Sequence, residues 1–321
     1  MTSRQQHSLC LLFAISAAVG CSPGKAPNIP PPLDTPTVSA PCSYSLDDTQ
    51  VHDIHSATLQ RDYQLFVSFP ETYDKRPDHT YPVLFVTDAD YGFPLIRSIA
   101  RRVGDHGRGL EEFVLVGLSY AIGDTPEFSR RRDYTPNTHG DADAVSDMPG
   151  RPVMYGEAER YRQFIEGEVF PYVAAHFHAD MTRKIYAGHS YGGLFGTYIL
   201  LTTPRMFQSY IISSPSLWFD HKRLLTEARN YGSHHYHLHA KVFLDVGAFE
   251  TLNPGSNDPR YNHKMDLVRD LQQLAGLLES QHYPDLQLQT TVFANEDHMT
   301  VFPLAITRGL QWALPPLTPS S

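Results

Sequence analysis

The sequence predicts an α/β fold in which a mostly parallel, twisted sheet is covered by helices on both faces. Short β-branched runs, typical of strands buried on both sides, recur along the chain. Segments with the helical spacing of apolar residues lie between these runs, and this alternation is typical of a parallel sheet. The chain has 321 residues, of which 41% are hydrophobic, so it can build a substantial core.

The predicted strands begin with an antiparallel pair within residues 54–69, where Tyr63, Leu65 and Val67 alternate with other side chains. The runs predicted as parallel strands are 83–86, 113–116, 184–187, 210–212, 242–246 and 286–293. Helices are expected at 158–178, 193–202, 222–230 and 264–281, and from about residue 300. Residues 120–156 show no clear period. We expect them to lie over the carboxyl ends of the strands, where function sits in such sheets.

The first 20 residues are expected to form a targeting segment. An apolar run from Leu9 to Val19 is too short to cross a bilayer permanently and fits a signal peptide. It ends in Ala-Val-Gly-Cys21, which resembles a bacterial lipobox and predicts lipid attachment at Cys21. The alternative is an ordinary cleaved signal peptide, and a Cys21–Cys42 disulfide then competes with acylation.

The residues that follow the targeting segment divide into a tether and one domain. Residues 21–42 are dense in proline and small polar residues and are expected to form an extended tether. One domain is expected over 43–316, with a short tail at 317–321. This organisation predicts a lipid-anchored protein of the bacterial cell envelope that faces the periplasm. A soluble periplasmic or secreted protein is the alternative.

Charge and composition exclude several classes of protein. The formal charge of −9 argues against a nucleic-acid binder, which needs a basic surface. Three cysteines cannot make a zinc site of four cysteines. No phosphate-binding glycine loop or nucleotide motif stands out. The histidine-rich residues 234–239 lack the helical pairing of a zinc-protease motif, so we expect adventitious metal binding there at most, and no cofactor.

Residues 188–192 read Gly-His-Ser-Tyr-Gly, the G-x-S-x-G pattern of a nucleophile elbow. The pattern follows a predicted buried strand and opens a predicted helix, which is the context that the elbow requires. A sharp turn there presents the Ser190 hydroxyl, and the helix N-terminus favours negative charge that develops beside it. The sequence therefore predicts an α/β-hydrolase fold with Ser190 as the nucleophile.

A serine hydroxyl needs a base, and in this fold the acid and then the histidine follow the serine along the chain. His298 comes directly after the last predicted strand and is the predicted base. Chain order disfavours the other histidines considered, which are His263, His282 and the pair His234-His235. Glu250 is the preferred acid. Asp245 competes with it, because both follow or end the strand at 242–246.

The oxyanion that forms when a serine attacks a carbonyl carbon needs two backbone N–H donors. Tyr191, directly after the nucleophile, is expected to supply one of them. The loop expected after the strand at 83–86 should supply the other, and Asp90 is the residue predicted for it.

The chain resembles the esterase family of α/β-hydrolases that includes enterochelin-type siderophore esterases, S-formylglutathione hydrolase and the mycolyltransferases. The stretches that carry the likeness are Tyr81–Phe85, Arg132-Asp133-Tyr134-Thr135-Pro136, Gly188–Gly193, Ser213-Ser214-Pro215-Ser216-Leu217-Trp218 and Asp297-His298. The family often has Asp-Gly-Asn where this chain has Asp88-Ala89-Asp90. The resemblance implies ester hydrolysis through an acyl-enzyme.

Two features bear on the substrate. Arg130 and Arg132 lie in the long segment over the site, and arginine suits an anionic, aromatic ligand such as a ferric catecholate. Trp218 is a candidate for the wall of the acyl pocket. The alternatives are that Arg132 pairs with Asp133 and that Trp218 only packs. The leading prediction is a serine esterase that acts on siderophore trilactones. An esterase for other acyl or feruloyl esters and a non-catalytic ligand-binding lipoprotein are the competing hypotheses.

Overall fold

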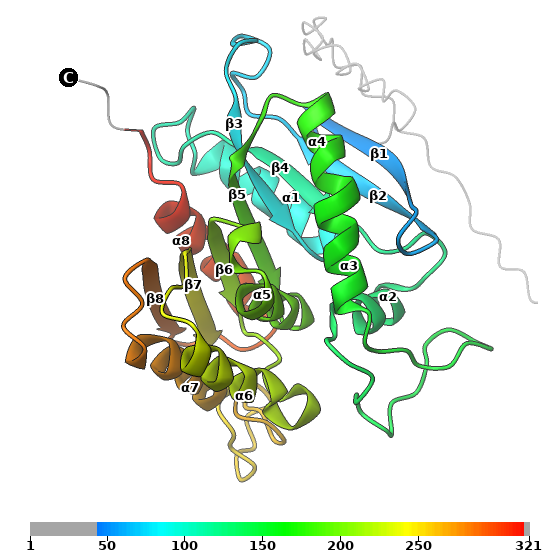
Figure 1. Cartoon of the computed structure of the whole chain (residues 1–321), viewed down its shortest axis with the longest axis vertical. Helices are drawn as coiled ribbons and strands as arrows, with labels where there is room; N and C mark the ends of the chain where they lie inside the picture. The colour runs from blue at the N-terminus through cyan, green and yellow to red at the C-terminus, as the bar shows by residue number, and fades with distance from the viewer. Residues whose placement is uncertain (1–43, 318–321) are drawn as a thin grey trace, which may run out of the picture. The chain divides into compact units, whose positions relative to one another are not determined.

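An eight-stranded sheet runs through the part of the chain that the computed structural model describes, residues 44–317 (Figure 1). Its strands are β1 (Thr49–Ser56), β2 (Arg61–Ser68), β3 (Tyr81–Val86), β4 (Val114–Leu118), β5 (Ala179–His189), β6 (Ser209–Ser213), β7 (Ala240–Gly247) and β8 (Leu286–Phe293). The order across the sheet is β1-β2-β4-β3-β5-β6-β7-β8. The pairs β1–β2 and β2–β4 are antiparallel and the others are parallel. The targeting segment, the tether, Cys21 and Cys42 lie outside the described residues.

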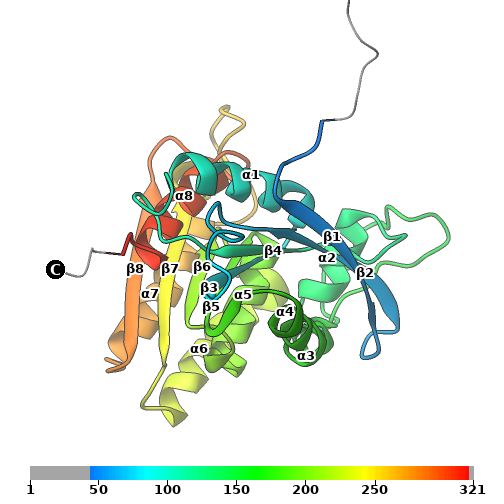
Figure 2. The same cartoon turned by 90° about the horizontal axis from the view of Figure 1, so that it is seen from above.

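Helices cover both faces of the sheet, as predicted. The helices α1 (Ala89–Arg102) and α8 (Val301–Ala313) lie on one face, as Figure 2 shows from above. The other face carries α3 (Ala158–Phe164), α4 (Phe170–His176), α5 (Tyr191–Thr202), α6 (Phe219–His234) and α7 (Leu267–Ser280). The strands from β2 to β8 contribute to both cores because their side chains alternate: Val83 and Phe85 of β3 join one core, and Leu84 joins the other.

Two helices were not predicted. Helix α1 follows β3, where a loop was expected, and it contains Pro94. Helix α2 (Pro126–Tyr134) lies within the segment that showed no period, and the Thr125 side chain caps its N-terminus by accepting a hydrogen bond from the Phe128 amide. The helix predicted at 158–178 is interrupted by a π-helical turn, Ile165–Val169, between α3 and α4. Within residues 44–317, no helix has the length and apolarity that a membrane crossing needs.

Candidate active site

Ser190 lies at the turn between β5 and α5. Its backbone adopts φ 59° and ψ −117°, a conformation that a residue with a side chain rarely takes. The turn is tight, because a Cβ placed on Gly188 would lie 2.6 Å from the backbone carbonyl of Gly192. The Ser190 amide donates a hydrogen bond of 3.0 Å to the Ser213 carbonyl, which fixes the turn against β6. The geometry is therefore that of a nucleophile elbow.

A cavity of about 590 Å³ opens beside Ser190. Its wall includes His298, Arg130, Asp88 and Met299, which come from segments that follow the carboxyl ends of different strands. The volume lies within the range of about 300–1,000 Å³ typical of small-molecule sites. The structure thus brings the predicted nucleophile and the predicted base to one cavity, although the chain separates them by a further three strands.

His298 is held by a buried carboxylate. Its Nδ1 lies 2.6 Å from Oε2 of Glu250, whose side chain is only 1% exposed. The other carboxylate oxygen, Oε1, accepts hydrogen bonds from the Gly247 amide at 2.8 Å and from the Ser214 hydroxyl at 2.5 Å. These bonds fix the carboxylate, and the contact at Nδ1 leaves Nε2 of His298 free to act on a serine proton.

Asp245, the competing acid, does not reach His298. Its Oδ1 accepts a hydrogen bond of 2.7 Å from the Ser213 hydroxyl, and burial raises its pKa well above the ordinary value. Ser213 also lies 3.3 Å from Nδ1 of His189, whose ring centroid is 4.6 Å from that of His298. Of the two acids that the sequence left open, the structure therefore places Glu250 against the histidine.

Comparison with known proteins identifies the family. Residues 56–275 match the family model described as "Putative esterase". The chain belongs to this esterase family. The ferri-bacillibactin esterase of Bacillus subtilis is 29% identical over 282 residues, which cover 85% of this chain and 92% of that protein. A siderophore triacetylfusarinine C esterase of Aspergillus fumigatus is 27% identical over 71% of this chain and 80% of its own.

Solved structures agree with the family and with the fold. The BES protein from Bacillus cereus is 26% identical and superposes with a TM-score of 0.72, covering 86% of this chain and 99% of that one. Together with the sheet order and the elbow, this confirms the predicted α/β-hydrolase fold. The chain is a carboxylic ester hydrolase of the serine type.

In this esterase, Arg130 forms part of the cavity wall. Its guanidinium makes a paired contact with the Asp88 carboxylate, with both N–O distances at 3.1 Å, and lies over the Tyr191 ring at 5.5 Å. Tyr120 also donates a hydrogen bond of 2.8 Å to Asp88. These contacts hold the Arg130 guanidinium in place at the cavity. The Arg130 side chain remains 20% exposed.

The prediction that Arg132 binds substrate is wrong. Its side chain is completely buried in the esterase and does not line the cavity. Its guanidinium lies 2.7 Å from Asp133 and 2.6 Å from Asp124, so both carboxylates compensate the buried charge. Arg132 thus holds α2 in place, as the alternative interpretation of the sequence had it.

The other predicted site residues lie as follows. Tyr191 is the first residue of α5, so its amide has no acceptor within that helix and is available to an oxyanion. Trp218 packs against Tyr191 with a centroid distance of 6.0 Å and does not line the cavity, which corrects its assignment to the acyl pocket. Cys21 lies outside the described residues.

Asp90 is also displaced from its predicted place. It lies in the first turn of α1 and lines a separate hollow together with Leu46 and Phe66, not the Ser190 cavity. The reason is that the chain enters α1 at Ala89, directly after Asp88 in a left-handed conformation with φ 54°, where the sequence had predicted a loop. Asp88 and Tyr91, its neighbours, do line the cavity.

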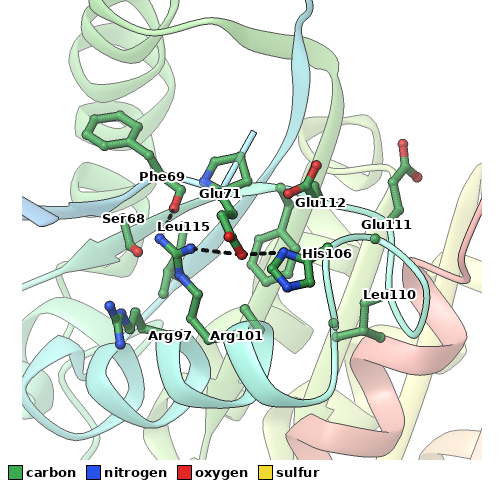
Figure 3. A pocket seen from close by; sticks show the side chains of 15 residues that line it. Ser68, Phe69, Glu71, Arg97, Arg101, His106, Leu110, Glu111, Glu112 and Leu115 are labelled. Carbon is green, nitrogen blue, oxygen red and sulfur yellow. Dashed lines mark hydrogen bonds and ion pairs between the residues drawn. The ribbon is translucent and has the colours of Figure 1, made fainter. Parts of the chain in front are cut away.

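A second hollow lies at the opposite, amino end of the parallel strands, before β4. Figure 3 shows Arg101 and His106 pointing toward the carboxylate of Glu71 at its centre. Its volume of about 40 Å³ admits only a few water molecules. The cavity beside Ser190 is therefore the better candidate for a substrate.

One residue of the cavity wall was missed by sequence reasoning. His189 lines the cavity beside His298, and burial lowers its pKa well below the ordinary value, so its ring is neutral. Its only signal in the sequence is its place before the serine in G-x-S-x-G.

Proposed function

We propose that this esterase hydrolyses the ester bonds of siderophores through an acyl-enzyme on Ser190. The observation that carries the proposal is the contact of His298 with the buried Glu250 carboxylate, which holds the imidazole in the wall of the same cavity as Ser190. Both curated relatives described above are named as esterases of siderophores. The Arg130 guanidinium in the cavity wall is paired with Asp88, and its planar group suits stacking on the aromatic groups of a catecholate substrate.

The geometry supports the following reaction. Oγ of Ser190 attacks the ester carbonyl carbon while Nε2 of His298 accepts the hydroxyl proton. The resulting oxyanion accepts a hydrogen bond from the Tyr191 amide. The ester C–O bond breaks, and His298 returns the proton to the departing alcohol. A water molecule then attacks the acyl-enzyme by the same route, which releases the acid and restores Ser190. Glu250 holds the imidazole and stabilises its charged form.

The test compares Ser190→Ala with Ser216→Ala. The two hydroxyl oxygens lie 3.4 Å apart, so both variants remove a hydroxyl from the same spot. A fluorophosphonate probe should label the wild type and the Ser216 variant, and it should not label the Ser190 variant. Hydrolysis of ferric enterobactin, followed by product mass, should fall by at least about 10³-fold in the Ser190 variant. A folded wild type that takes no label would favour the non-catalytic binder.

The same mass readout separates the substrate classes. Feruloyl sugars and simple acyl esters are offered beside the trilactone. If kcat/KM for feruloyl or simple esters exceeds that for the ferric trilactone, the siderophore assignment is overturned while the serine mechanism stands. Replacing Arg130 with Gln should lower kcat/KM for the ferric trilactone more than for neutral p-nitrophenyl butyrate.

We further propose lipid attachment at Cys21 and a periplasmic location. The apolar run that ends at Cys21 and the proline-rich tether behind it support this proposal. The mass of the N-terminal peptide from the membrane fraction tests it. A diacylglyceryl cysteine is expected, whereas a free N-terminus beyond Cys21 in the soluble fraction would contradict it.

A further inference from the structure

The histidine-rich run before β7 meets a carboxylate before β8. Because β7 and β8 are parallel and Ala240 lies opposite Leu286, the residues just before the two strands are neighbours. Leu238 is fully buried, so His237 and His239 on either side of it share the outer face of the chain. Their Nδ1 atoms lie 2.6 and 3.2 Å from the same atom, Oδ2 of Asp285.

We propose that His237, His239 and Asp285 form a surface site for a divalent transition metal, Zn²⁺ foremost. Ligand atoms bound to zinc at about 2.0–2.2 Å in tetrahedral geometry lie about 3.3–3.6 Å from one another, so small side-chain movements would admit the ion. Imidazole nitrogens bind zinc, nickel and copper in preference to Mg²⁺ and Ca²⁺, which prefer oxygen ligands. All three side chains are exposed, which leaves the remaining coordination positions to water.

Two other histidines of the same run show what distinguishes this site. Nδ1 of His234 lies 2.8 Å from the Asn230 carbonyl, and Nδ1 of His235 lies 3.0 Å from the Tyr231 carbonyl. These imidazoles are bound to their own helix. His237 and His239 instead direct the same ring atom to one carboxylate oxygen, with their rings within 3° of parallel. A metal ion would use both imidazoles together with the carboxylate.

The site lies apart from the proposed chemistry. It is at the amino end of β7 and β8, while Glu250 and His298 follow the carboxyl ends of the same strands. A metal there would join the starts of these two strands and stabilise the folded chain by mass action. The inference is therefore independent of the proposed esterase function.

Calorimetric titration of Zn²⁺ into the chelator-treated protein, made without a histidine tag, tests the proposal. We expect saturable binding at one site with a Kd in the micromolar range and a rise in Tm with Zn²⁺. Asp285→Asn and the double variant His237→Ala/His239→Ala should each weaken binding at least about tenfold. The matched control His234→Ala/His235→Ala should keep the wild-type Kd, and Mg²⁺ should raise Tm in none of the proteins.

Circular dichroism confirms that each variant is folded, and Asp285→Asn keeps the test usable should the double variant not fold. A wild-type Kd weaker than about 1 mM overturns the proposal. So does an equal loss of affinity in the His234/His235 control, because the binding then belongs to the histidine-rich run as a whole.

Discussion

Two histidine–carboxylate contacts of the same length lie at opposite ends of the β7–β8 pair. The His298–Glu250 contact and the His237–Asp285 contact both measure 2.6 Å between Nδ1 and a carboxylate oxygen. The Glu250 side chain is 1% exposed and has two further donors on its second oxygen. The Asp285 side chain is 37% exposed.

The difference shows that distance alone does not define the role of such a pair. A buried carboxylate with every oxygen occupied cannot rotate away, so it orients one imidazole permanently. An exposed carboxylate is screened by water and contributes little as an ion pair, but it remains accessible to a metal ion. The following experiments test this contrast in decreasing order of expected effect.

Replacing Glu250 with Gln should have the largest effect. We expect kcat for ester hydrolysis to fall by about 10⁴-fold, because a neutral amide neither orients the imidazole correctly nor stabilises its charge. The matched control is Asp62→Asn, which changes a surface carboxylate 2.7 Å from His55. Its kcat should stay within about twofold of wild type. Steady-state kinetics with p-nitrophenyl butyrate measure kcat for both variants. An equal loss of kcat in both would show that the buried carboxylate beside His298 has no role that the exposed carboxylate beside His55 lacks.

Gly247→Ala should disturb the His298–Glu250 pair through a steric clash alone. A Cβ at this position would lie 2.5 Å from the Glu296 carbonyl oxygen, in the segment that leads to His298. The carbonyl belongs to the backbone and the Cβ is fixed directly to it, so neither atom can move without shifting the chain. We expect a loss of about 1–3 kcal/mol in the free energy of unfolding together with reduced kcat. Urea denaturation measures the free energy of unfolding. If the variant keeps the stability and activity of the wild type, the loop that carries His298 moves aside more easily than its backbone contacts indicate.

Asp245→Asn should alter the pH dependence of stability. Burial raises the pKa of Asp245 above its ordinary value of 3.8, so the folded protein holds a proton that the unfolded chain releases. Its contribution to stability is complete below about pH 3.8 and is lost as pH rises toward the folded pKa, by about 1.4 kcal/mol for each pH unit crossed. The Asn variant cannot ionise. Urea denaturation at pH 5 and pH 8 should therefore show a smaller decline than in wild type.

Asp285→Asn in the metal-free protein should have the smallest effect. An exposed histidine–carboxylate pair contributes about 0–1 kcal/mol, and we expect the free energy of unfolding to change by no more than that. Urea denaturation in the presence of a chelator measures it. A larger loss would show that Asp285 supports the β7–β8 connection without any metal.

The sequence allowed the strands and the proposed triad to be predicted because their signals are local. Ser190 carries a motif in the right context. Glu250 comes just after the buried strand β7, and His298 follows β8, an edge strand whose residues are partly or fully exposed but whose sequence is still typical of a strand. Since parallel strands end at one edge of the sheet, chain order alone brought these residues together. The match of residues 56–275 to the esterase family agrees with this prediction.

Other features depend on partners that the sequence does not reveal. Helix α1 contains Gly92 and Pro94, which weaken any helical pattern, yet a Cβ at residue 92 would lie 2.9 Å from Val86, so packing demands the glycine. Arg132 stands in a run of three arginines that suggests exposure, and only the fold shows Asp124 and Asp133 around it. The meeting of His237 with Asp285 likewise depends on strand register.

The position of β8 at the border of the sheet also orders events during maturation. The elbow serine follows the central strand β5, while the imidazole proposed to activate it follows the edge strand β8, which comes late in the chain. A chain in which β8 has not yet joined the sheet therefore has the Ser190 hydroxyl without its proposed proton acceptor. The proposed triad is therefore complete only when β8 has paired with β7.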